Sequence, residues 1–219
     1  MVISPQDMTL MKTTSFFEQT GKLLLLAVGI LFLCQACSKP YSAQGTEEEK
    51  EFDLLLRKGK WEKIVKISQE RPVESLACQN AVRLAMWHMG MASRQSLDRC
   101  LLNSHDVLGS ETAALMMSDI YMQLGMVNMA RRAAFDAMVS VEGDRLNGRA
   151  LQRLAEVAII TRQYELARKY LSILEENNFY GKWTREARQM IEHPELFQQS
   201  STYQHLRDIY EKTQDQFFL

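Results

Sequence analysis

The residues whose surroundings most directly indicate chemistry are two cysteines near the N-terminus. Cys34 closes an apolar run over residues 23–34, and Cys37 follows the small residue Ala36. A thiol placed after a small side chain at the end of such a run is the group that bacterial lipoprotein processing acylates, because the signal peptidase accepts only small residues before the cysteine. Cys34 follows the large Leu33, so we predict lipidation at Cys37.

The apolar run favours a cleaved signal over a membrane span. A spanning helix needs about 20 apolar residues, whereas this run has twelve and stops at Gln35. Secretory signals have apolar cores of about 7–15 residues preceded by positive charge, supplied here by Lys12 and Lys22. We therefore expect residues 1–36 to be a lipoprotein signal peptide, with an uncleaved signal anchor or an ordinary secretory peptide as alternatives.

Residues 37–46 are predicted to be a flexible tether before a folded domain over residues 47–219. The segment is rich in small and polar side chains, which bury too little surface to fold alone. Stable anchoring takes more than one acyl chain, as the diacylglyceryl and N-acyl groups of a bacterial lipoprotein provide. In some lipoprotein-rich bacteria, acidic residues directly after the lipidated cysteine direct the protein to the cell surface. Here the first acidic residue after Cys37 is Glu47, so a periplasm-facing position in the bacterial envelope is favoured over surface exposure.

The overall charge gives no basis for a nucleic-acid partner. The chain has 26 basic and 27 acidic residues and a net charge of −1, which is not the footprint of a nucleic-acid-binding protein. With only 10 glycines and 4 prolines in 219 residues, the composition is typical of a helical protein.

The histidines form no recognisable catalytic or metal-binding pattern. None of His88, His105, His193 and His205 stands in an HExxH motif or beside a CxxC pair. The chain also has no G-x-S-x-G motif and no glycine-rich phosphate loop. We predict no catalytic residue, no metal, no cofactor and no small-molecule substrate, and the chain is predicted not to be an enzyme.

Two further cysteines, Cys78 and Cys100, flank a predicted turn at Gly90. Antiparallel helices would bring them level, and the periplasm is oxidising. The sequence leaves open both a disulfide between them and two buried free thiols.

Four turns share one pattern, in which a helix ends, a turn residue follows, and an apolar or aromatic residue stands two places later. Glycine at such a turn accepts the left-handed conformation that ends a helix, so the turn with Arg162 is expected to use a different cap. The four turns are Gly59-Lys60-Trp61, Gly90-Met91-Ala92, Gly125-Met126-Val127 and Arg162-Gln163-Tyr164, spaced by 31, 35 and 37 residues.

Apolar residues between the turns recur with the helical period. The last predicted helix carries the stripe Tyr203, Leu206, Ile209 and Tyr210, which we expect to seal the open end of a helical stack. The predicted helices cover residues 47–58, 61–70, 75–89, 92–103, 111–124, 127–141, 147–161, 164–177, 182–192 and 202–214.

Two segments, YMQLGMVNMARRAAFDAM and EVAIITRQYELARKYLSIL, resemble tetratricopeptide repeats (TPRs). Gly125, Val127 and Ala130 match that motif, as do Tyr164 and Ala167. The chain departs from the motif at Ser118, where glycine is common. The resemblance implies an all-α fold, a right-handed stack of antiparallel helix pairs (an α-solenoid) with a C-terminal capping helix.

A closer resemblance covers residues 51–197. The strings GKWEKIV, LGMVNMARRAAFDAM, LAEVAIITRQYELARKYL and FYGKWTREA look like the soluble C-terminal region of an uncharacterised Bacteroidota family of multi-pass membrane proteins. That family has no known function, so the resemblance implies no catalytic residues.

In the TPR analogy, the first helix of each repeat lines a concave groove that takes an extended peptide or a partner helix. The alternative is that these positions are solvated or packed against the neighbouring unit. Trp87 would be the anchor of this groove, since tryptophan is a frequent interface hot spot. The predicted groove residues are Asn80, Leu84, Trp87, Leu115, Asp119, Met122, Gln152, Glu156 and Ile159.

These observations favour a lipid-anchored helical-repeat protein that binds or assembles another envelope protein. The alternatives are a cell-envelope enzyme with an unrecognised site and an accessory subunit of a multi-pass membrane protein.

Overall fold

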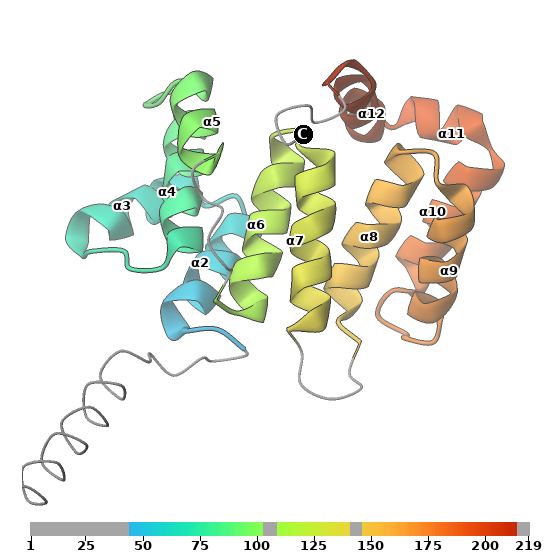
Figure 1. Ribbon diagram of the computed structural model, residues 1–219, viewed down its shortest axis with the longest axis horizontal. Helices are drawn as coiled ribbons and strands as arrows, with labels where there is room; N and C mark the ends of the chain where they lie inside the picture. The colour runs from blue at the N-terminus through green and yellow to red at the C-terminus, as the bar shows by residue number, and fades with distance from the viewer. Residues whose placement is uncertain (1–43, 103–108, 141–145, 214–219) are drawn as a thin grey trace, which may run out of the picture. The chain divides into compact units, whose positions relative to one another are not determined.

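The computed structural model describes residues 44–102, 109–140 and 146–213 (Figure 1). The chain divides into two compact units, residues 1–41 and 42–219, and every described residue belongs to the second. The predicted signal peptide, Cys37 and most of the predicted tether lie outside the described residues.

All regular structure in the described part is α-helical, as the sequence predicted. Eleven helices follow one another in these residues, with no strand between them. None of them is long and apolar enough to cross a membrane. They are α2 (Glu47–Arg57), α3 (Trp61–Glu70), α4 (Leu76–His88), α5 (Arg94–Leu102), α6 (Glu111–Gln123), α7 (Val127–Val139), α8 (Gly148–Ile160), α9 (Tyr164–Glu175), α10 (Gly181–Glu192), α11 (Pro194–Gln199) and α12 (Ser201–Thr213).

Side-chain caps fix where several helices begin. At the start of α2, the Thr46 hydroxyl accepts from the Glu49 N–H at 3.2 Å, and the Glu49 carboxylate accepts from the Thr46 N–H at 3.0 Å. This reciprocal pair satisfies two backbone donors that the first helical turn leaves free. Ser110 and Asn147 each accept from the backbone N–H three residues on, which starts α6 and α8.

The four predicted turns have the same backbone structure. Gly59, Gly90 and Gly125 have φ values of 60°, 72° and 76°, and Arg162 has φ 61°. In each turn, this residue's N–H donates to the carbonyl three residues earlier, and the next N–H donates to the carbonyl five residues earlier. The expectation of a different cap at Arg162 is therefore wrong, because the arginine adopts the left-handed conformation that usually favours glycine.

Helices joined by these turns pack as antiparallel pairs, α6 with α7 and α8 with α9, and α7 also packs against α8 (Figure 1). Small residues at Ala130, Ala134 and Ala137, all fully buried, allow close approach. The Ser118 hydroxyl of α6 donates to the Ala130 carbonyl of α7 at 2.9 Å. This bond crosses the seam of the pair.

Two large apolar clusters, with a small third one between α6, α7 and α8, fill the interior of the described domain. The larger one takes residues from α2 to α8 and adds Leu206 of α12. The second joins α8 to α9, α10 and α11, with Leu171 and Phe197 among its buried members. Because α8 contributes to both clusters, it links the two halves of the described domain.

The last described helix turns back toward the middle of the domain. The short helix α11, which the sequence analysis did not predict, begins at Pro194 and leads into α12. Helix α12 packs against α8 (Figure 1), and Leu206 is buried in the larger cluster with Tyr203 and Tyr210 packed beside it. The predicted stripe is thus an apolar contact surface. The sequence predicted that it would seal the open end of the stack, whereas in the structure it packs against inner helices.

Candidate functional site

Most of the nine predicted groove residues lie in the interior. Asp119, Gln152 and Glu156 are half-buried, as is Trp87. Asn80 is fully buried, and its amide accepts from Arg83 at 2.7 Å. The buried members of the predicted row are Asn80, Leu84, Leu115, Met122 and Ile159.

Trp87, the predicted anchor, packs beside the larger core cluster. Its ring lies 4.7 Å from the ring of His88, and the guanidinium of Arg94 lies 5.9 Å from its centroid. These contacts give Trp87 a packing role at the end of α4.

A groove of about 380 Å³ opens where α2, α6, α8 and α12 meet. Asp119 and Met122 of the predicted row line it, so the structure brings two of the nine residues to one hollow. Residues of α12 form one wall, which sequence periodicity did not indicate. The lining residues are Leu56, Arg57, Asp119, Met122, Gln123, Arg153, Thr202, His205 and Leu206.

Two of the lining residues, Asp119 and Arg153, belong to a chain of charged side chains. The Arg149 guanidinium lies 2.8 Å from the Asp53 carboxylate of α2 and donates to the Asp119 carboxylate of α6 at 2.5 Å. Arg57 also pairs with Asp53, at 3.1 Å. One half-buried arginine on α8 therefore holds carboxylates from two other helices.

The same chain continues along α8 to α12. Arg153 donates to Asp119 at 2.7 Å and to Glu156 at 2.6 Å. The Tyr203 hydroxyl of α12 then donates to the second oxygen of Glu156 at 3.2 Å. We call the residues Asp53, Asp119, Arg149, Arg153, Glu156 and Tyr203 the ion network.

Burial sets the protonation behaviour of this network. It raises the pKa of Glu156, and the neighbouring Arg153 only partly offsets this effect. Burial and the Glu156 charge also raise the pKa of Tyr203, so its hydroxyl keeps its proton and remains a donor. Burial alone would lower the pKa of Arg149 and Arg153, but the paired carboxylates reverse this and raise it.

Arg207 holds α12 in place along the groove. Its guanidinium donates to the carbonyls of Ile159 and Ile160 at the end of α8, at 2.7 and 3.0 Å. It also lies 3.5 Å from the centroid of the Phe197 ring. A cation at these carbonyls complements the negative end of the α8 dipole, so Arg207 fixes α12 beside the end of α8.

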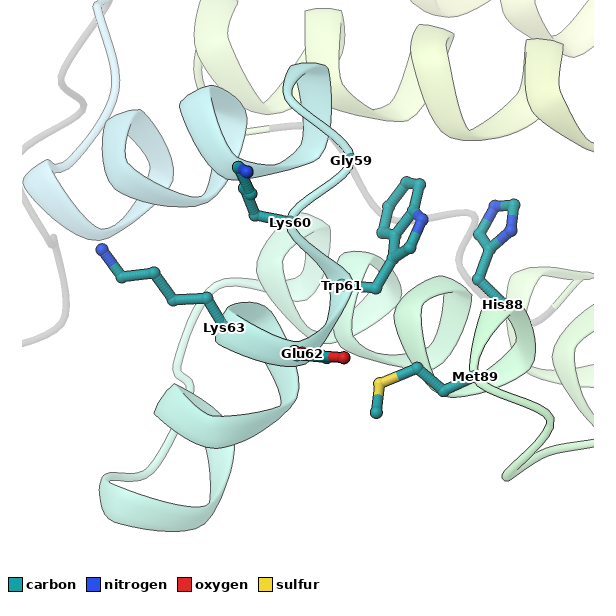
Figure 2. Close-up of a pocket in the computed structure, with 7 residues that line it drawn as sticks. All are labelled: Gly59, Lys60, Trp61, Glu62, Lys63, His88 and Met89. Atoms are coloured by element: carbon teal, nitrogen blue, oxygen red, sulfur yellow. The ribbon is translucent and has the colours of Figure 1, made fainter.

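A second, larger hollow of about 630 Å³ lies at the turn between α2 and α3 (Figure 2). The Trp61 ring stacks on His88 with centroids 4.3 Å apart and planes 10° from parallel. His88 in turn lies 3.0 Å from the Gln123 side-chain oxygen at the end of α6. We call this site the Trp61 hollow; its lining residues are Gly59, Lys60, Trp61, Glu62, Lys63, His88 and Met89.

The rim of the Trp61 hollow is exposed and basic. Lys60 and Lys63 are exposed on one side (Figure 2), and Glu62 is the acidic side chain among the lining residues. Met89 is 41% exposed on the other side. Sequence analysis identified the turn before Trp61 but not the hollow, because only the packing of α3 against α4 brings His88 and Met89 to it.

Comparison with known proteins identifies a family for this chain. The sequence model of a family of unknown function, DUF6057, matches residues 4–219. The chain belongs to this family. No curated protein and no solved structure matches the chain. The DUF6057 match includes the residues on both sides of Cys37 as well as the helical domain.

In this DUF6057 member, Cys78 is a free, buried cysteine, and burial raises the pKa of its thiol. The side chain of Cys100 lies outside the described part of the structure, as does His105. Among the described residues, no group of three or more His, Cys, Asp or Glu side chains could hold a metal ion.

Proposed function

We propose that this chain is a lipid-anchored, TPR-like helical-repeat protein that acts as a protein-binding or assembly module in the bacterial envelope. Its helix pairs would form a right-handed stack, attached to the membrane through Cys37 and facing the periplasm. Four turns of the same structure and the sequential packing of α6 to α9 support the repeat interpretation.

The Trp61 hollow is the observation that carries the binding role. An exposed hollow that combines an aromatic ring with a methionine presents two residue types that are enriched at protein interfaces, and the lysines at its rim add positive charge that a partner can complement. The predicted groove is the weaker candidate, because α12 already lies along it. A partner segment that presents an apolar side chain beside carboxylates would fit the Trp61 hollow, with the apolar group on Trp61 and Met89 and the carboxylates on Lys60 and Lys63.

Charge reversal at the rim tests the binding role. Lys60→Glu combined with Lys63→Glu changes exposed side chains only, so the fold should be retained. Envelopes are cross-linked in the cell, and proteins captured with the tagged full chain are identified by mass spectrometry. We expect the partner to be captured by the wild type and lost from the double variant.

The matched control is Lys169→Glu combined with Lys212→Glu, which makes the same change in net charge on α9 and α12, away from the hollow. This control should retain the partner. A partner that both double variants retain, or that both lose, would exclude the Trp61 hollow as the binding site.

The anchor is tested separately by labelling cells with a clickable fatty acid. Cys37→Ala should abolish the label and release the chain from the membrane fraction, whereas Cys34→Ala should leave both unchanged. Label that survives in Cys37→Ala would refute the anchor.

A further inference from the structure

Of the exposed large apolar side chains in the described residues, three are the most exposed. Phe179 is 94% exposed, Val139 is 64% exposed and Leu146 is 59% exposed. Val139 is the last residue of α7, Leu146 stands two residues before α8, and Phe179 lies in the turn between α9 and α10. All three are therefore at helix ends.

Contacts between these segments place the helix ends on one side of the domain. Asn147, which caps α8, donates to the Glu111 carboxylate at the start of α6. The backbone of Gly148 lies against the Tyr180 ring, which leaves no room for a Cβ. The start of α6, the start of α8 and the 177–180 turn are therefore neighbours, and Figure 1 shows the end of α7 beside them.

The segment that leads to Cys37 reaches the domain at this same end. The Thr112 hydroxyl, in the first turn of α6, donates to the Gln44 carbonyl at 2.6 Å. The chain from Cys37 to Gln44 can span at most about 25 Å when fully extended. A lipid on Cys37 would therefore hold this end close to the bilayer.

We propose that this end of the domain rests on the bilayer that holds its lipid, with Phe179, Leu146 and Val139 at the boundary between headgroups and acyl chains. The proposal rests on the lipid anchor proposed above. A short tether favours the membrane over a protein as the occupant, because a folded partner would have to fit into the gap that the tether allows. Exposed apolar side chains beside a lipid anchor add to membrane attachment.

This orientation has a consequence for the Trp61 hollow. The hollow contacts Gln123 at the end of α6, whereas the tether contacts Thr112 at the start of the same helix. The proposed bilayer contact and the proposed partner site therefore lie at opposite ends of α6, and the partner would approach from the side away from the membrane.

The test places a photoreactive phenylalanine analogue, p-benzoylphenylalanine, at position 179 of the full chain in its own membranes. The matched control carries it at Gln204, an exposed position on α12. We expect irradiation to cross-link phospholipid at position 179 and not at position 204. Phe179 makes no buried contact, so this replacement should preserve the fold.

Acylation of Cys37 is measured by mass spectrometry on the same samples. An acylated chain whose position 179 cross-links only protein, or no lipid, overturns the bilayer contact and leaves the binding role untouched. An acylated chain that cross-links lipid equally at both positions also overturns it. A chain without acylation refutes the anchor itself and, with it, the premise of this inference.

Discussion

Arg162 has a positive φ at the turn position where the other three turns have glycine. A side chain in the left-handed region costs about 1–2 kcal/mol because its Cβ approaches the following carbonyl oxygen. Glycine removes that contact, but it also makes the unfolded chain more flexible, which offsets part of the gain. We therefore predict that Arg162→Gly raises the free energy of unfolding by about 0.5–1 kcal/mol. Urea denaturation measures the change.

The exposed ion pair between Arg162 and Glu211 is lost in this variant, so Glu211→Ala serves as the control. It should change stability by less than about 0.5 kcal/mol, because exposed pairs contribute little. A destabilised Arg162→Gly beside a neutral Glu211→Ala would contradict the prediction.

Glu175 gives a prediction that depends on pH. Hydrogen bonds from Arg188 lower the pKa of Glu175 from its ordinary value of 4.5. The pair therefore stabilises the fold above that value, and its contribution is lost as pH falls through the lowered pKa. We predict that Glu175→Gln costs at most about 1 kcal/mol at pH 7, because the pair is exposed, and that the difference from wild type vanishes in strong acid.

Chemical denaturation at several pH values measures this difference. Glu176→Gln makes the same substitution at the exposed neighbouring position, and it serves as the control for loss of one carboxylate without loss of the pair with Arg188. A Glu175→Gln difference that grows as the pH falls would have the wrong sign for this mechanism.

At the scale of the elements, the sequence predicted helix positions well. All ten predicted helices are present, and their ends agree within two residues wherever those ends are described, because periodic apolar residues and glycine turns mark them locally. Helix α11 was missed because a proline just after a predicted helix, here Pro194, is usually a sign that the helix has ended. Pro194 also starts α11, since proline at a first helical position lacks only an N–H that the helix does not use.

The position of α12 was beyond prediction from the sequence. Periodicity gives a helix its apolar face but not the surface that this face covers. The same limit applies to the ion network, whose pairs between α2, α6 and α8 span tens of residues and leave no local spacing signal. Asp119 and Glu156 were predicted as groove residues, while their partners Arg149 and Arg153 were not considered.

Alanine substitutions at two glycine turns distinguish the effect of α12 packing on stability from the effect of backbone strain. A Cβ at Gly125 would lie 2.9 Å from Ile209 of α12, whereas a Cβ at Gly90 would have nothing within 4 Å. Both residues have positive φ, so alanine costs about 1 kcal/mol at either site. We predict that Gly125→Ala costs about 1 kcal/mol more than Gly90→Ala, because α12 must shift.

Thermal or urea unfolding of both variants measures the comparison. Equal losses of stability would show that α12 does not press on this turn.

At the scale of the whole molecule, we expect α12 to make the described domain more cooperative than a simple row of repeats. In a linear array each unit contacts only its neighbours, whereas Leu206 reaches the cluster that α2, α4 and α6 share. We predict that Leu206→Ala costs about 2–3 kcal/mol and weakens hydrogen-exchange protection in α2 and α6 as well as in α12.

Leu54→Ala, at a position of α2 that is 44% exposed, is the control and should be nearly neutral. Loss of protection confined to α12 would mean that the last helix frays independently of the rest.

The bond from Ser118 to the Ala130 carbonyl has a consequence for how the central pair assembles. Smooth alanine seams tolerate sliding, because one small residue resembles the next. A slip of the two helices along each other would leave the Ser118 hydroxyl without its acceptor in an apolar setting, which is unfavourable. The serine thus favours one alignment of the two helices over the neighbouring ones, and this alignment sets where α8 can pack against α7.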